Sequence, residues 1–100
     1  MKLGIHVKTD RHLEQVLGIV NAAVSKGHEV NIFTMAAGER LLENPKYSDL
    51  CRNPKIRMSF CDHDATHQGI KKDVIPADIA CGSQYDNAVM VNEADRVIVL

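Results

Sequence analysis

The chain has 100 residues, of which 45% are hydrophobic and 25% are charged, and its formal net charge is −1. These values are ordinary for a globular protein and predict one domain over residues 1–100. They exclude the basic excess of a nucleic-acid or anionic-membrane surface. No apolar run reaches the roughly 18 to 20 residues of a membrane span, and no apolar leader precedes the first strand, so we expect a cytoplasmic protein.

The first third of the chain predicts a strand, a helix and a second strand. Residues 2–8 alternate apolar with small or polar side chains, which is the period of a strand. Apolar residues then recur at helical spacing over 13–24, with Asp10 as the expected N-cap and Gly27 as the stop. A second strand follows at 28–35. Two strands joined by one helix through short turns form a βαβ unit, which sets the fold class as α/β with parallel strands.

The middle of the chain predicts broken helical structure and a third strand. Residues 36–38 are expected to form a small-residue turn. A second helix over 39–44 is then interrupted or ended by Pro45, and a further helical turn lies within 47–51. The third strand, over 56–60, leads directly to a cysteine.

The last third predicts two short elements, a helix and a final strand. A short helix is expected over 65–71 and an irregular strand over 73–81. Ser83 is the expected N-cap of the last helix, and 96–100 is an apolar final strand. Four residues of that helix are expected to face inward or along a boundary: Tyr85, Ala88, Val89 and Asn92.

Cys61 stands where the third strand ends and a polar loop with Asp62, His63, Asp64 and His67 begins. Ligands of open α/β sheets bind beyond the carboxyl ends of the strands. An odd number of cysteines in a reducing compartment favours a reactive or metal-binding thiol over a disulfide. A thiolate is favoured at a helix N-terminus or beside cations, which the histidines can supply, whereas the aspartates act against it. The simpler alternative is a small buried hydrophobe.

The other two cysteines admit several interpretations. Cys61, His63 and His67, with Cys81 as a distant fourth residue, have the ligand types of tetrahedral zinc, although no C-x-x-C pair accompanies them. Cys81 is also a candidate resolving cysteine for Cys61, but core packing is favoured for it and for Cys51.

Several common functional motifs are missing. The loop over residues 9–12 contains no glycine, so it offers neither a dinucleotide-binding turn nor a phosphate-binding loop. No G-x-S-x-G nucleophile motif occurs. We therefore expect no cofactor.

Three segments of the chain resemble the DsrE/DsrF-like proteins, which include the sulfur-relay subunits called Tus. They read GHEVNIFTMAAGERLL, IRMSFCDHDATHQGI and GSQYDNAVMVNEADRVIVL, and they follow the order of the family. The resemblance implies a three-layer α/β/α sandwich with a mainly parallel five-stranded sheet, commonly assembled as trimers or hexamers. It also implies that Cys61 matches the cysteine that carries a persulfide in the sulfur-relay members. The DHDATH that follows Cys61 departs from the better-known family pattern.

The leading hypothesis is a sulfur carrier or sulfurtransferase. Cys61 would hold a persulfide, and His63 or His67 would favour the thiolate or shuttle a proton. The partners would be a protein sulfur donor and acceptor together with further copies of the chain, and not nucleic acid or a membrane. The alternative is a non-enzymatic oligomeric module or a zinc-binding protein that uses Cys61, His63 and His67.

Overall fold

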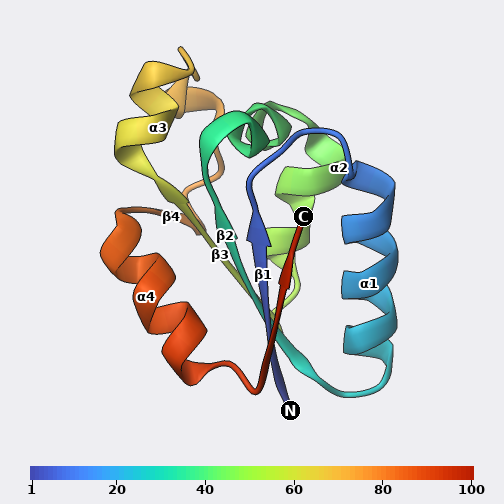
Figure 1. The fold of residues 1–100 in the computed structure, drawn as a ribbon. Coiled ribbons are helices and arrows are strands. Elements are labelled where there is room, and N and C mark those ends of the chain that lie inside the picture. Colours follow the sequence, from blue (N-terminus) through green and yellow to red (C-terminus); the bar gives the residue numbers. More distant parts are fainter.

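The computed structural model describes residues 1–100 and contains one five-stranded sheet in the order β4-β3-β2-β1-β5. Every strand pair is parallel, so all carboxyl ends lie at one edge of the sheet (Figure 1). This confirms the α/β class and the five-stranded sheet, and it makes the sheet parallel throughout. The strands are β1 (Lys2–Val7), β2 (Glu29–Thr34), β3 (Ile56–Cys61), β4 (Ile79–Gly82) and β5 (Arg96–Val99).

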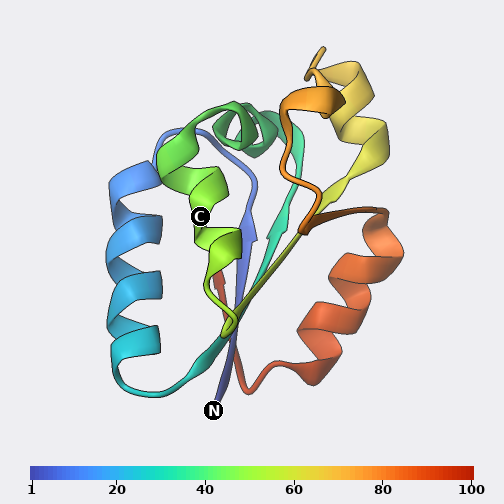
Figure 2. The same cartoon turned by 180° about the vertical axis from the view of Figure 1, so that it is seen from behind.

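Helices cover both faces of the sheet. Helices α1 (Leu13–Ser25) and α2 (Pro45–Ser48) lie on one face and α4 (Gln84–Glu93) lies on the other, while α3 (Asp62–His67) sits over the carboxyl edge (Figures 1 and 2). Each connection from β1 to β4 leads to the next strand on the same side, so β1, β2, β3 and β4 are neighbours in that order. The connection after β4 crosses back over the sheet and places β5 on the other side of β1. Because right-handed crossovers place forward and returning helices on opposite faces, α4 alone covers its face.

The main hydrophobic core lies between the sheet and α1 with α2. Alternate strand residues such as Ile5, Ile32 and Met58 point into it, as the period of a strand requires. A smaller cluster of Phe33, Cys61 and Met90 lies under α4. Gly4 allows α4 to approach β1 closely, because a Cβ atom there would collide with the Met90 sulfur.

The starts of two helical segments differ from the sequence prediction. Asp10 does not cap α1, because His12 occupies the N-cap position without a side-chain cap, and the Asp10 carboxylate lies 4.0 Å from Arg40 instead. Residues 36–38 do not form a simple turn, because they begin the 3-10 helix η1 (Ala36–Glu43).

The interruption at Pro45 is confirmed. The ring fits the first turn of α2, where no backbone N–H is needed, and Asn44 caps that turn by accepting a hydrogen bond from the Lys46 N–H at 3.0 Å. A second 3-10 helix, η2 (Asp49–Arg52), then leads towards β3.

The elements after Cys61 also shift. Helix α3 begins at Asp62, directly after the cysteine, and ends before Gly69, whose φ of +70° suits glycine. The segment before β4 contains the 3-10 helix η3 (Lys72–Val74) rather than a continuous irregular strand.

Ser83 caps α4 as predicted, but the buried face of this helix is not the expected one. The Ser83 side chain accepts from the Tyr85 N–H, and the Asp86 carboxylate accepts from the Ser83 N–H, which completes a capping box. Tyr85, Ala88 and Asn92 are exposed, so these predictions are wrong, whereas Val89 is half-buried as a boundary residue. Met90 is the residue of α4 that packs against the sheet. None of the helices has the length and hydrophobicity that crossing a membrane requires.

The buried pair of Thr34 and Tyr47 provides a test of the core. Their hydroxyl oxygens lie 2.6 Å apart and both side chains are fully buried. Tyr47→Phe should lower the free energy of unfolding by about 1–3 kcal/mol in urea denaturation, because the Thr34 hydroxyl loses its partner. Thr34→Val is the matched variant, and the double variant should lose less than the sum of the two single losses. Strictly additive losses would contradict this interpretation of the pair.

Candidate functional site

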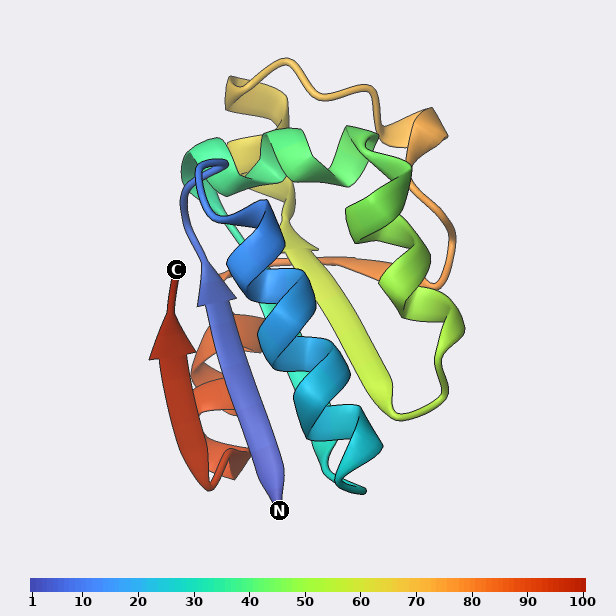
Figure 3. The same cartoon turned by 90° about the vertical axis from the view of Figure 1, so that its right-hand side faces the viewer.

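The register of the sheet brings three strand ends together. Thr34 at the end of β2 pairs with Phe60, and Cys61 at the end of β3 pairs with Gly82 at the end of β4. The segments that leave these strand ends are η1, α3 and the start of α4. Figure 3 shows η1 and α3 above the carboxyl edge of the sheet. Any group at the end of β3 is therefore surrounded by residues from all three segments.

Cys61 is the central side chain of this edge. It is the last residue of β3 and the N-cap residue of α3, and it is 4% exposed. Its side chain packs with Phe33 and Met90 under α4, on the face of the sheet opposite Met58 and Phe60. Cys61 is also one of the residues that line an open pocket, together with Met35, Asp62, His63, Asp64, Gly82, Ser83 and Gln84.

The two predicted histidines lie at different distances from this pocket. His63 is exposed and lines the pocket together with Cys61. His67 is exposed at the last residue of α3 and does not line the pocket. Lys72, a further candidate cation, pairs with the Asp62 carboxylate and lowers the pKa of that carboxyl through the hydrogen bond. The cations near Cys61 in sequence therefore do not converge on its thiol.

Cys81 points away from Cys61. It pairs with Phe60 in the register, so it lies on the face of the main core and lines a separate pocket with Ile75 and Ile79. The expected core packing of Cys81 is wrong, because the residue is exposed at the end of this face. Its thiol donates a hydrogen bond to Asp62 at 3.4 Å, and partial burial followed by this bond raises the pKa of the Cys81 thiol. Burial also raises the pKa of Cys51. This placement argues against Cys81 as a resolving partner.

Glu39 is a site residue that the sequence analysis missed. It is 0% exposed, and neither carboxylate oxygen has a hydrogen-bond partner. Burial raises the pKa of Glu39 to about 8, and the nearby charges of Asp64 and Asp62 act in the same direction. A charged residue in a predicted helix normally points to solvent, so no local pattern indicates its burial. The one residue in the sequence that could indicate the burial of Glu39 is the preceding Gly38. A Cβ atom at Gly38 would lie 2.6 Å from the Val7 carbonyl oxygen, so η1 packs closely against β1 there.

The zinc ligand set expected from the sequence does not assemble. Of the predicted ligands, only Cys61 belongs to a close cluster, and its companions are Glu39 and Asp64 rather than His63 and His67. The thiol sulfur and one carboxylate oxygen from each acid all lie within 4.8 Å of one another. The group that can hold a metal at this edge is therefore one thiol with two acids.

The Asp64 carboxylate is fixed by the backbone of η1. One of its oxygens accepts a hydrogen bond from the Ala36 N–H at 2.8 Å. Ala36 has a φ of +51°, a left-handed conformation that costs a non-glycine residue roughly 1–2 kcal/mol. This hydrogen bond joins the segment after β2 to α3, and it fixes the positions of the strained Ala36 and the Asp64 carboxylate relative to each other.

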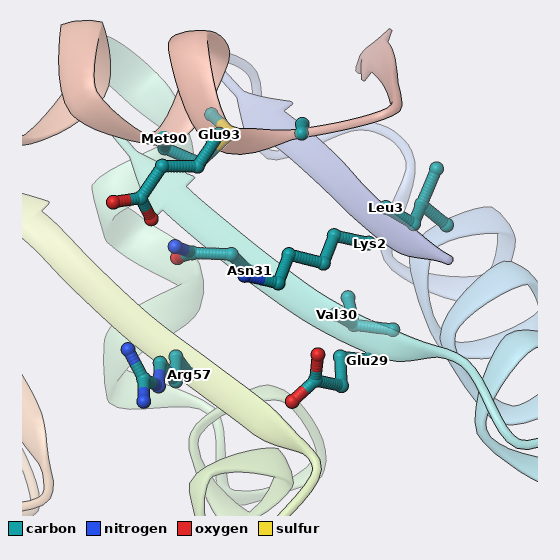
Figure 4. A pocket seen from close by; sticks show the side chains of 9 residues that line it. Lys2, Leu3, Glu29, Val30, Asn31, Arg57, Met90 and Glu93 are labelled. Atoms are coloured by element: carbon teal, nitrogen blue, oxygen red, sulfur yellow. The ribbon is translucent and has the colours of Figure 1, made fainter.

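A second pocket lies at the opposite end of the sheet, next to the last turn of α4 (Figure 4). The side chains of Lys2, Asn31, Arg57 and Glu93 point into it from three strands and the helix. It contains no thiol, and the basic and acidic groups balance one another. We therefore place the chemistry at the Cys61 edge.

The fold is an α/β/α sandwich with a five-stranded parallel sheet, and the DsrE/DsrF-like proteins share this fold. Two solved structures carry the comparison. The protein of unknown function MTH1491 from Methanobacterium thermoautotrophicum has a TM-score of 0.80 at 12% identity, covering 99% of this chain and 98% of its own. The YchN protein from E. coli has a TM-score of 0.73 at 12% identity, covering 100% of both chains.

These two structures belong to the DsrE/DsrF-like family, so the resemblance drawn from the sequence is confirmed at the level of the fold. No family model matches the sequence, and no curated protein matches it.

The buried Glu39 predicts a specific pH dependence of stability in metal-free protein. Its pKa is about 8 in the folded chain against an ordinary 4.5, so between these values the folded state holds the extra proton. The free energy of unfolding should therefore fall as the pH rises from about 5 to 8. Glu39→Gln removes this titration, so the stability of the wild type relative to the variant should decline over that range and level off above it. Parallel pH profiles in urea denaturation would contradict the assignment.

Proposed function

We propose that the protein is a cytoplasmic sulfur carrier or sulfurtransferase that holds a persulfide on Cys61. The observation that carries the proposal is the position of this thiol, at the carboxyl end of the central part of the sheet and next to an open pocket. The DsrE/DsrF-like fold, which belongs to a family linked to sulfur relay, supports it. The pocket provides space for the outer sulfur of a persulfide next to the Cys61 side chain, which is otherwise buried.

The transfer chemistry needs a thiolate and two protein partners. The Cys61 thiolate attacks the outer sulfur of a donor persulfide, forming one S–S bond while the donor S–S bond breaks and the donor leaves as a thiolate. An acceptor thiolate then attacks the outer sulfur on Cys61, and Cys61 leaves as a thiolate. His63 lines the same pocket, which supports a role for it in taking the thiol proton and returning it, although it makes no contact with the thiol in the close cluster. For His67, which lies outside the pocket, a role in proton transfer stays a prediction.

Sulfur loading tests this function directly. After incubation with a cysteine desulfurase and cysteine, mass spectrometry should find an adduct of one sulfur atom (~32 Da) on the Cys61 peptide. Cys61→Ser should lose the adduct and the transfer to an acceptor. Cys81→Ser and Cys51→Ser are matched controls and should keep both, because the pKa of each of these thiols is raised. Sulfur found on Cys81 or Cys51 alone would overturn the proposal.

We also propose that the chain assembles into a trimer or hexamer through the α4 face near β5. Val97 and Val99 pair with Gly4 and His6, so their side chains lie on the face that α4 covers. They are nevertheless 39% and 51% exposed, so α4 leaves this end of the face open. An edge strand with exposed apolar side chains is a surface that proteins normally cover.

Light scattering after gel filtration tests the assembly. The wild-type chain should have the mass of three or six copies, and Val99→Lys should shift it towards smaller species because the lysine charge must be desolvated in the contact. Val74→Lys is the matched control, because Val74 is 54% exposed on η3, away from this surface. A wild-type monomer, or equal effects of the two lysines, would contradict the proposed contact.

A further inference from the structure

Glu39 has no partner that explains its burial. Both of its oxygens are enclosed without a hydrogen bond, although a buried carboxylate normally pairs with a cation or accepts several hydrogen bonds. The cation whose charge acts on Glu39 is Lys72, and its ammonium group is already paired with Asp62 and hydrogen-bonded to Thr66. The acid is therefore left beside a second acid and a thiol.

The arrangement has the composition of a metal site. One Glu39 oxygen, the Cys61 sulfur and one Asp64 oxygen all lie within 4.8 Å of one another. Tetrahedral Zn²⁺, bonded to sulfur at about 2.3 Å and to oxygen at about 2.0–2.2 Å, holds its ligand atoms about 3.4–3.6 Å apart. Side-chain rotations that close the cluster by little more than about 1 Å therefore meet this geometry.

We propose that Glu39, Cys61 and Asp64 form a binding site for a divalent, thiophilic cation of the zinc type. The Cys61 thiolate provides the soft ligand that selects such an ion over Mg²⁺ or Ca²⁺. The carboxylates of Glu39 and Asp64 provide further negative charge that balances the charge of the cation. Three protein ligands leave the fourth tetrahedral position to solvent or to a small ligand.

The surroundings supply an entry path and an outer shell. Cys61 and Asp64 both line the open pocket, so an ion reaches them from solvent, while the enclosed Glu39 forms the inner wall of the cluster. The hydrogen bond from the Ala36 N–H fixes one oxygen of Asp64, as backbone donors commonly do for ligating carboxylates.

Such an ion and a persulfide would compete for the same sulfur atom. Binding the cation takes the proton from the Cys61 thiol and ties up the thiolate, so the metal-bound chain cannot accept sulfur until the ion leaves. The metal site does not rest on the sulfur-transfer proposal, because it is measured on protein that has met no sulfur donor.

The experiment uses Zn²⁺ and Co²⁺ on full-length protein stripped with a chelator. Dialysis against Zn²⁺ should leave about one metal ion per chain. Co²⁺ should give a thiolate-to-metal charge-transfer band that is absent in Cys61→Ser. Glu39→Gln and Asp64→Asn, which keep the side-chain shape, should each weaken Zn²⁺ binding by about tenfold or more. Bound Zn²⁺ should also protect Cys61 from alkylation in the wild type, a measurement that needs no variant.

His63→Ala and His67→Ala are the matched controls for the ligand set. Both histidines are exposed and neither belongs to the cluster, so these variants should bind Zn²⁺ as the wild type does. Absence of Zn²⁺ binding by the wild type would overturn the site, and so would a Co²⁺ complex without the thiolate band. A loss of affinity in either histidine variant equal to that in Glu39→Gln would assign the ion to other ligands and overturn it too.

Discussion

The parallel pairing of β3 between β2 and β4 is the constraint on which the site depends. Because Phe60 pairs with Thr34 and Cys61 with Gly82, the chain leaves three neighbouring strands at one level of the sheet. The segments that follow must then pack against one another above that level, since their backbone groups need partners there. Glu39, Cys61 and Asp64 are 22 and 3 residues apart in sequence, and this pairing is what brings them together.

The returning connection from β4 to β5 shapes the face on which the thiol lies. A single helix, α4, covers that face, and it packs closely on β1 because Gly4 has no side chain in the way of Met90. Cys61 is thereby buried against Phe33 and Met90, and it also lines the pocket at the strand end. Because α4 is the only helix on this face, Val97 and Val99 of β5 remain exposed. The single returning connection therefore accounts both for the pocket beside Cys61 and for the surface proposed for assembly.

The electrostatics of the edge differ from those of a simple activated cysteine. Lys72 forms a salt bridge with Asp62, and His63 and His67 are exposed on α3. The ionisable groups clustered with the Cys61 thiol are acids. Such a cluster calls for a proton on Glu39 or for a bound cation, because burial disfavours its charged form. The hydrogen bond that the strained Ala36 donates to Asp64 keeps this acid in place. A carrier of sulfur and a site for a thiophilic ion are compatible uses of this one sulfur atom at different times.

Elements whose causes are local can be predicted from the sequence. The alternation of side chains predicts the strand at 2–8, and helical spacing predicts the helix over 13–24. The fixed φ of Pro45 and the hydroxyl of Ser83 predict where two later helices begin. Each of these causes acts within a few residues of the chain. The sequence also predicted Cys61 at a strand end. The folded arrangement is needed to see that Cys81 points to the opposite face, that Lys72 pairs with Asp62, and that Glu39 is buried beside Cys61. These outcomes depend on the register between strands far apart in the chain, and no short stretch of residues encodes that register.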